Sequence, residues 1–184
     1  LSTADLLTNN PEVTTLAGSG SSGSANGTGT SATFNGPWGM TTDGTNLYVA
    51  DSNNHRIRKI VISTGAVTTL AGSGSQGSTN ATGTSARFNA PRGITKVGTN
   101  LYVADSDNHL IRKIVISTGA VTTFAGSTSS GSTDATGTSA RFNKPRAITT
   151  DGTNLYVADN SNHKIRKIVI STGVVTTLAG STQG

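Results

Sequence analysis

The sequence predicts an all-β protein, and three observations lead to this fold class. Valine, isoleucine and threonine are frequent, and they alternate with polar residues over short stretches, as in half-buried strands. No stretch has the apolar spacing of an amphipathic helix. The chain also repeats itself every 54 residues, with residues 34–87 and 88–141 identical at 43 of 54 positions. A repeat of this length with several short strands is typical of β-propeller blades.

Each repeat has room for four antiparallel strands. In the first copy, Pro37 precedes the innermost strand, an Asp43-Gly44 turn leads into the second, and Ser63-Thr64-Gly65 separates the third from the fourth. A loop rich in glycine, serine and threonine then leads to the next repeat. The strands expected in this copy are 39–42, 46–51, 56–63 and 67–72.

We expect one propeller segment over residues 1–184. Its parts are an N-terminal segment (1–33), then blade 1 (34–87), blade 2 (88–141) and blade 3 (142–184), each of the first two with its loop. The hexapeptide VTTLAG of the fourth strand also occurs at residues 13–18. This predicts an extra fourth strand at 12–18, ahead of three complete blades.

Several motifs identify the family that the chain resembles. Asn108-His109-Leu110 spells the signature of the NHL repeat, and Asn54-His55 and Asn162-His163 stand at the equivalent positions. The LYVAD and VTTLAG segments match as well. The chain resembles NHL-repeat β-propellers, and most of all the long, near-identical arrays of secreted bacterial proteins. Ala147 departs from the other copies, which have glycine there.

Composition favours a secreted chain without a membrane span. Cysteine is absent, methionine occurs once, and serine and threonine are abundant, which points to an extracellular setting. The first residue, Leu1, fits a mature chain or a fragment of a longer one. The longest apolar run, residues 47–50, is far too short to cross a bilayer. A net charge of +5 permits anionic partners.

Three blades do not close into a ring, because a closed propeller needs at least four. Two copies of the chain would supply six blades, and a head-to-tail arrangement that fails to close would give a filament. The missing blades of a longer chain are the other source. We therefore expect a non-enzymatic interaction or structural module whose partners are a second copy, further blades, or other proteins and glycans. The strand at 12–18 would pair with a neighbouring blade.

The repeated histidines do not predict a metal site. They lie in the turn between the second and third strands, too far from the axis and from one another to share an ion. We expect each to bind the preceding aspartate or nearby backbone and to hold the turn. The structural turn residues are Asp51, His55, Asp105, His109, Asp159 and His163.

No residue set in the repeat register forms a triad or a carboxylate pair, so we predict no catalytic residues and no cofactor. A hydrolase or lyase at the channel mouth, as in some enzymes with similar folds, is the third hypothesis. Function specific to this chain is expected where the copies differ. The candidate residues for a ligand-facing, anion-accepting channel mouth are Trp38, Arg92, Lys144 and Arg146.

Nucleic-acid binding is the alternative from another class, because some animal NHL proteins bind RNA on a basic face. Arg58-Lys59, Arg112-Lys113 and Arg166-Lys167 recur in the third strand. Neighbours in a strand point to opposite faces, so we expect solvated positions and no continuous basic patch. Few aromatic residues are left for base stacking. RNA or another polyanion is therefore the less favoured partner.

Overall fold

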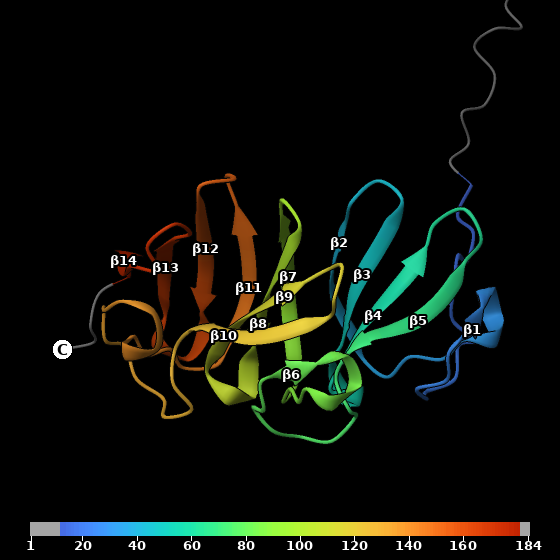
Figure 1. Ribbon diagram of the computed structural model, residues 1–184, viewed down its shortest axis with the longest axis horizontal. Coiled ribbons are helices and arrows are strands. Elements are labelled where there is room, and N and C mark those ends of the chain that lie inside the picture. Colours follow the sequence, from blue (N-terminus) through green and yellow to red (C-terminus); the bar gives the residue numbers. More distant parts are fainter. Residues whose placement is uncertain (1–11, 181–184) are drawn as a thin grey trace, which may run out of the picture.

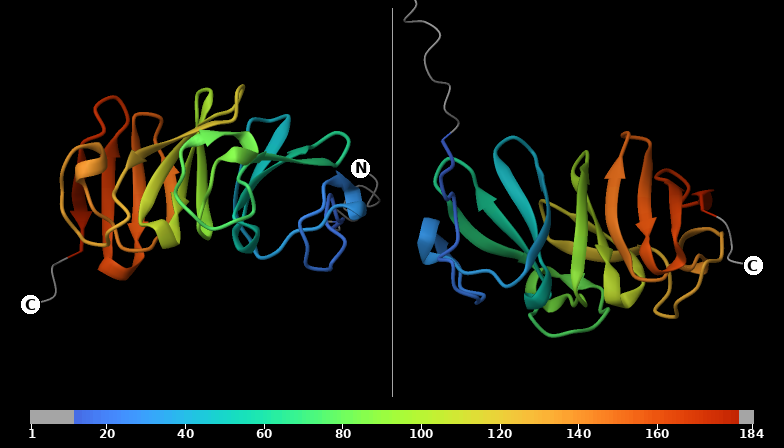
Figure 2. Two further views of the ribbon diagram at one scale, coloured as in Figure 1. Left: turned by 60° about the horizontal axis from the view of Figure 1, so that its bottom comes forward. Right: turned by 180° about the vertical axis from the view of Figure 1, so that it is seen from behind.

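A computed structural model describes residues 12–180 and shows three β-sheets arranged side by side (Figure 1). Each sheet is one blade, and the innermost strands of adjacent blades contact each other. The first and last strands, β1 (Gly27–Thr28) and β14 (Val175–Ala179), lie at opposite ends of the array, so the blades form an open arc (Figure 2). The predicted all-β propeller fold is confirmed. Within the described residues, no helix is long and apolar enough to span a membrane.

The strands follow the repeat. Blade 1 contains β2 (Pro37–Thr42), β3 (Asn46–Asp51), β4 (Arg56–Val61) and β5 (Ala66–Ala71). Blade 2 contains β7 (Pro91–Val97), β8 (Asn100–Asp105), β9 (Leu110–Val115) and β10 (Ala120–Ala125). Blade 3 contains β11 (Pro145–Thr150), β12 (Asn154–Asp159), β13 (Lys164–Val169) and β14 (Val175–Ala179).

These bounds differ from the prediction in three strands: the fourth is shifted by one residue, to Ala66–Ala71, and the other two differences have a physical reason. The innermost strand begins two residues earlier, at Pro37, because a bulge between Pro37 and Met40 lets it pair with β3 from the proline onward. The third strand ends at Val61 because the Gly65 N–H donates to the Val61 carbonyl at 2.8 Å. Gly65 has φ 69°, which closes this turn without strain.

The structure adds short elements that the sequence did not suggest. Part of the loop before each of the first two blades pairs with the outer edge of the fourth strand, β1 (Gly27–Thr28) with β5 and β6 (Ala81–Thr82) with β10. In blade 3 a single bridge, Thr136 to Val174, stands at this place. Short 3-10 turns also precede the three histidines, at Ser52–Asn54, Ser106–Asn108 and Asn160–Asn162.

The predicted strand at residues 12–18 is wrong. These residues have no strand pairing, and Val13 is 95% exposed. A fourth strand needs the third strand of its own blade as hydrogen-bond partner, and the described residues hold none for this segment. The last residue of this segment, Gly18, nevertheless binds the loop before blade 1 in the way that the end of one blade's fourth strand binds the loop before the next blade. The Gly18 N–H donates to the Gly29 carbonyl at 3.1 Å, as the Gly72 N–H does to the Gly83 carbonyl.

Adjacent blades pack through two different apolar faces. The face toward the following blade carries a tyrosine, two alanines and an isoleucine, and the face toward the preceding blade carries larger aliphatic and phenylalanine side chains. We call the packed interface between two adjacent blades a seam. The seam between blades 2 and 3 contains the residues equivalent to those between blades 1 and 2, 54 positions later in the chain. The seam between blades 1 and 2 joins Tyr48, Ala50, Ile57 and Ala71 to Phe88, Ile94, Leu101, Val103, Ile114 and Val121.

Glycine lets the innermost strands approach each other at the axis. A Cβ on Gly39 would lie 2.5 Å from the Arg92 carbonyl oxygen, and one on Gly93 would lie 2.6 Å from that of Arg146. Both distances are too short for any side chain, so each seam requires glycine at this position. Ala147 is the equivalent residue of blade 3, and no blade follows it among the described residues.

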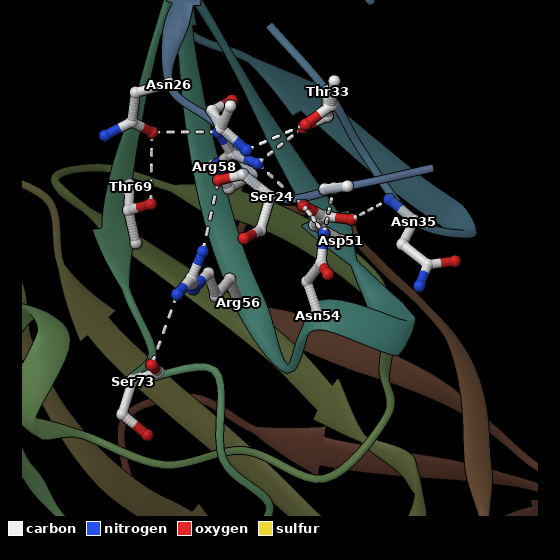
Figure 3. Close-up of polar contacts among 12 residues, drawn as sticks. Ser24, Asn26, Thr33, Asn35, Asp51, Asn54, Arg56, Arg58, Thr69 and Ser73 are labelled. Atoms are coloured by element: carbon white, nitrogen blue, oxygen red, sulfur yellow. Dashed lines mark hydrogen bonds and ion pairs between the residues drawn. The ribbon is translucent and has the colours of Figure 1, made fainter. Parts of the chain in front are cut away.

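Each blade contains a buried ion pair that the sequence analysis did not predict. Figure 3 shows the pair of blade 1. In blade 1, Arg58 Nη1 lies 2.8 Å from Asp51 Oδ2, and both side chains are fully buried. Arg58 also donates to the carbonyls of Thr33 and Ala25 and to Asn26 Oδ1, at 2.9–3.1 Å. The pair therefore fastens the long loop before the blade to its second and third strands.

The expectation that these arginines are solvated is wrong for all three blades. The equivalent pairs, Arg112 with Asp105 and Arg166 with Asp159, are also buried and 2.8 Å apart. The reason is that this face of the third strand is covered by the loop, whose carbonyl groups need donors. The adjacent lysines lie on the opposite face and are partly exposed.

Replacing Arg112 by Met tests how much this ion pair contributes to the stability of the fold. Arg112→Met leaves the Asp105 carboxylate buried without its cation, and it also removes donors from loop carbonyls. We expect the free energy of unfolding to fall by about 3–5 kcal/mol. The matched control, Lys113→Met, should change it by less than about 1 kcal/mol. Denaturant unfolding measures both, and equal effects of the two substitutions would contradict this assignment.

Candidate functional site

The residues predicted to form the channel mouth separate into two places. Trp38, Arg92 and Arg146 each follow the proline that begins an innermost strand, and together they line one hollow at the axis. Lys144 is not among the residues lining it. Its backbone is left-handed, with φ 51°, which turns the chain ahead of Pro145. Lys144 Nζ lies 4.0 Å from Asp107 Oδ1 in an exposed pair.

The axial hollow has a volume of about 270 Å³. Its rim contains an aromatic ring and a cation in contact, since the Arg92 guanidinium carbon lies 4.9 Å from the centre of the Trp38 ring. Trp38 is 58% exposed, so its ring is open to a ligand. The remaining lining is small or apolar and comes from all three innermost strands: Gly39, Met40, Gly93, Ile94, Ala147 and Ile148.

The lining of the axial hollow can bind anions and planar groups. Its lining includes two arginines and no aspartate, glutamate or histidine, so it offers no general acid or base of ordinary pKa. Guanidinium groups bind carboxylates and phosphates, and an exposed indole ring stacks on planar or cationic groups. In residues 12–180, no three or more His, Cys, Asp or Glu side chains are grouped so as to hold a metal ion.

The histidines of the turns join one blade to the next. His55 Nδ1 accepts a hydrogen bond from the Ala90 N–H at 3.1 Å, and His109 Nδ1 accepts one from the Lys144 N–H at 3.1 Å. We expected the preceding aspartate or nearby backbone as the partner of each histidine. The aspartates bind the buried arginines and other groups instead, and the backbone that His55 and His109 bind belongs to the loop before the following blade. His163 accepts no hydrogen bond within the described part of the chain.

These histidines must be neutral at the nitrogen that accepts the bond. Burial lowers the pKa of His55 below its ordinary value of 6.5, while the Asp107 carboxylate acts in the opposite direction. Burial also lowers the pKa of His109, and Lys144 lowers it further, against the effects of Asp107 and Asp159. Both seams are therefore set for neutral imidazole.

The two ends of the arc leave apolar surface uncovered. On blade 3, Ile165 is 41% exposed, whereas its equivalents Ile57 and Ile111 are fully buried in seams. Hollows of about 230 and 220 Å³ flank Ile165. On blade 1, Met40 is 62% exposed at the position of the buried Ile94. A hollow of about 640 Å³ lies beside Phe34, Asn35 and Gly36.

Sequence reasoning missed two groups, and only one had a usable signal. The Asp51–Arg58 pair recurs unchanged and with the same separation in every copy, which could have suggested an ion pair. The N–H group that binds each histidine belongs to a position occupied by Gly36, Ala90 or Lys144. Because only its backbone is used, the side chain varies and gives no signal.

The stability of the seams is expected to depend on pH. The unfolded chain takes up protons on its histidines near pH 6.5, before the folded chain does, so the free energy of unfolding should fall as the pH drops through that value. Each protonated seam should cost about 1 kcal/mol. The double variant His55→Asn/His109→Asn is the comparison, because asparagine tolerates the left-handed backbone and keeps an oxygen acceptor but does not take up a proton in this pH range.

The measurement is denaturant unfolding of both proteins at about pH 7.5 and about pH 5. The decrease in the free energy of unfolding between these two pH values should be smaller in the double variant than in the unmodified protein. If both proteins lose equally, the histidines do not cause the pH dependence.

Comparison with known proteins gives related sequences for this fold. The NHL repeat matches residues 34–60. Human NHL repeat-containing protein 2 is 33% identical over 168 residues, which cover 85% of this chain and 22% of that protein. The Arabidopsis thaliana protein SUPPRESSOR OF QUENCHING 1, chloroplastic, is 31% identical over 175 residues, or 90% of this chain and 17% of the relative. The chain thus spans about a fifth of these curated relatives.

Solved structures agree on the architecture. An auxiliary nutrient binding protein from Bacteroides ovatus superposes with a TM-score of 0.62 at 25% identity, over 77% of this chain and 36% of that one. A catalytically inactive virginiamycin B lyase from Staphylococcus aureus superposes with a TM-score of 0.52 at 21% identity, over 77% and 40%, and it shows the fold alone. The matched repeat recurs in register three times along the sequence, so the chain is built from NHL repeats that fold as β-propeller blades.

Proposed function

We propose that this chain is an interaction module that binds further blades of its own kind at the two ends of its arc, with a second copy completing a six-bladed ring. The observation that carries this proposal is the pair of uncovered end faces. Each contains the residues that are buried in the internal seams. An extracellular setting is part of the proposal and rests on composition alone.

The two end faces are complementary by sequence. Blade 3 offers Tyr156, Ala158 and Ile165, the same residue types that blades 1 and 2 bury toward the following blade. Blade 1 offers Phe34 and Leu47, which are partly buried, whereas their equivalents in blades 2 and 3 are fully buried. Blade 1 of a second copy can therefore meet blade 3 with nearly the contacts of an internal seam.

Polar groups at the two ends match as well. His163 Nδ1 is the equivalent of the two histidine acceptors, and it accepts no bond within residues 12–180. Gly36 is the equivalent of Ala90 and Lys144, has the same left-handed backbone at φ 60°, and its N–H has no recorded acceptor in that range. A seam between copies would join the Gly36 N–H of one to the His163 of the other.

The methyl group of Ala147 prevents the seam between two copies from being identical to the internal seams. By the geometry of Gly39 and Gly93, the Cβ of Ala147 would lie about 2.5 Å from a carbonyl oxygen of the incoming strand. The seam between copies must open slightly at the axis to accept it. Association is therefore weaker than packing between internal blades.

The N-terminal segment takes part in this proposal. Residues 13–18 have the same sequence as 175–180, and Gly18 is already docked on blade 1 as a fourth strand would be. The seam has room for one such segment. We propose that residues 13–18 replace β14 of the partner, since this exchanges identical contacts while keeping the bond of Gly18.

The alternatives have less support in the geometry. An extended RNA or polyanion surface loses three of its six repeated basic residues, because the arginines are buried and paired. A channel-mouth hydrolase or lyase lacks an acid, a base or a grouped set of metal ligands in the axial hollow of the described chain.

The mass of the protein in solution tests association. Light scattering over a concentration series should give twice the mass of one chain, or a growing series if the rotation does not close. A folded single chain at every concentration would overturn the proposal. Removing residues 1–18 should weaken association, and unchanged association would remove the strand exchange while leaving the ring.

Ala147→Gly provides a directional test. Removing the methyl group should tighten association, although glycine in a strand costs the single chain about 0.5–1 kcal/mol of stability. Ala120→Gly is the matched control, because it carries the same strand cost in β10, away from both end faces. Dissociation constants from sedimentation should fall for Ala147→Gly alone. No change would mean that the blade 3 face does not receive a blade in this geometry.

A further inference from the structure

The arginines of the axial hollow differ from the buried arginines of the third strands in having no anionic partner. Arg58, Arg112 and Arg166 are each paired with a carboxylate. Arg92 and Arg146 make no salt bridge within residues 12–180, and their guanidinium groups donate no recorded hydrogen bond there. Two cations thus stand at one small hollow without neutralisation.

Arg92 is held in place although it lacks a partner. Its guanidinium group lies over the Trp38 ring at 4.9 Å. Its Nε is buried without a hydrogen-bond acceptor among the described residues, as are those of the three buried arginines of the third strands, but only Arg92 also lacks a carboxylate beside its other nitrogens. A buried donor without an acceptor costs free energy unless a ligand or water supplies one. Stacking fixes the plane of the fork, so little side-chain freedom is lost when an anion binds.

The surroundings favour a small ligand with negative charge. No acidic side chain lines the hollow, and its volume of about 270 Å³ is below the range usual for drug-sized ligands. Met40, Ile94 and Ile148 supply apolar surface to the same hollow. This surface weakens the competition of water for the guanidinium groups.

We propose that the axial hollow binds a small oxyanion, a carboxylate or a phosphate, between Arg92 and Arg146 and beside the Trp38 ring. Both groups have the planar or trigonal oxygen pattern that the guanidinium fork matches in pairs. The three residues occupy equivalent positions of the repeat, which hold tryptophan in blade 1 and arginine in blades 2 and 3.

This site goes beyond the proposed association of blades and does not depend on it. All three side chains belong to one chain, so binding can be measured at concentrations where the protein is a single chain. Failure of the oxyanion site would leave the ring proposal untouched, and failure of the ring would leave this site untouched.

Trp38 is the only tryptophan, so its fluorescence reports directly on the hollow. We would titrate the protein with sodium phosphate and with sodium citrate, against sodium chloride at equal ionic strength, because screening alone also changes the signal. A saturable change with a Kd of roughly 1 mM or tighter is expected for at least one of the two anions. A response equal to that of chloride for both would overturn the site.

Matched variants locate the binding. Arg146→Gln keeps the stacked Arg92–Trp38 pair and should weaken binding at least tenfold. Arg87→Gln removes the same charge from an exposed loop position outside the hollow and should leave it unchanged. Equal affinity of Arg146→Gln and the unmodified chain would refute the assignment.

A third titration, with a short single-stranded RNA, distinguishes the source of the phosphate. RNA binding that is tighter than that of free phosphate and lost in Arg146→Gln would retain the site and assign its ligand to a polymer backbone. RNA binding that Arg146→Gln leaves intact, without saturable phosphate or citrate binding, would place anion recognition elsewhere and overturn the site.

Discussion

The buried pair of an arginine and an aspartate in each blade determines how a sequence so rich in glycine, serine and threonine stays ordered. Arg58 reaches the carbonyls of the loop before the blade, and Asp51 accepts hydrogen bonds from the Asn35 N–H and the Asn54 side chain. These two side chains thus give the loop the partners that it cannot find within itself. Burial makes the arrangement demanding, because either charge alone would be costly.

The loop before each blade, held by this ion pair, also positions a phenylalanine that packs between blades. It brings Phe34 under the Arg58 guanidinium, at 5.1 Å from the ring centre, and Phe88 and Phe142 lie in the same way under Arg112 and Arg166. In blades 2 and 3 these phenylalanines are fully buried and belong to the seam with the preceding blade. The ion pair therefore acts on packing between blades as well as on the loop.

The strands and their order could be predicted from the sequence, because both depend on local patterns that are repeated three times. It failed at residues 12–18, where the hexapeptide is identical but the strand partner is absent, so the same residues have two structures. It also failed at Arg58, because alternation gives the face of a side chain but not what covers that face. The hollow residues Trp38, Arg92 and Arg146 were found from differences between copies. Lys144, chosen in the same way, lies outside the hollow, because its position in the repeat is two residues earlier and no copy lines the hollow with the residue at that position.

The short strands β1 and β6 have a consequence for a chain made of near-identical repeats. Such repeats can pair with the wrong copy, during folding or between molecules, and the free outer edge of a sheet is where this pairing begins. In blades 1 and 2 the loop occupies part of that edge with its own backbone, within the same repeat. In blade 3 the loop covers the same part of the edge through the bridge from Thr136 to Val174 and a hydrogen bond from the Val175 N–H to the Ala135 carbonyl at 2.9 Å. Mispairing between copies is therefore restricted in every blade to the part of the fourth strand that its own loop leaves open.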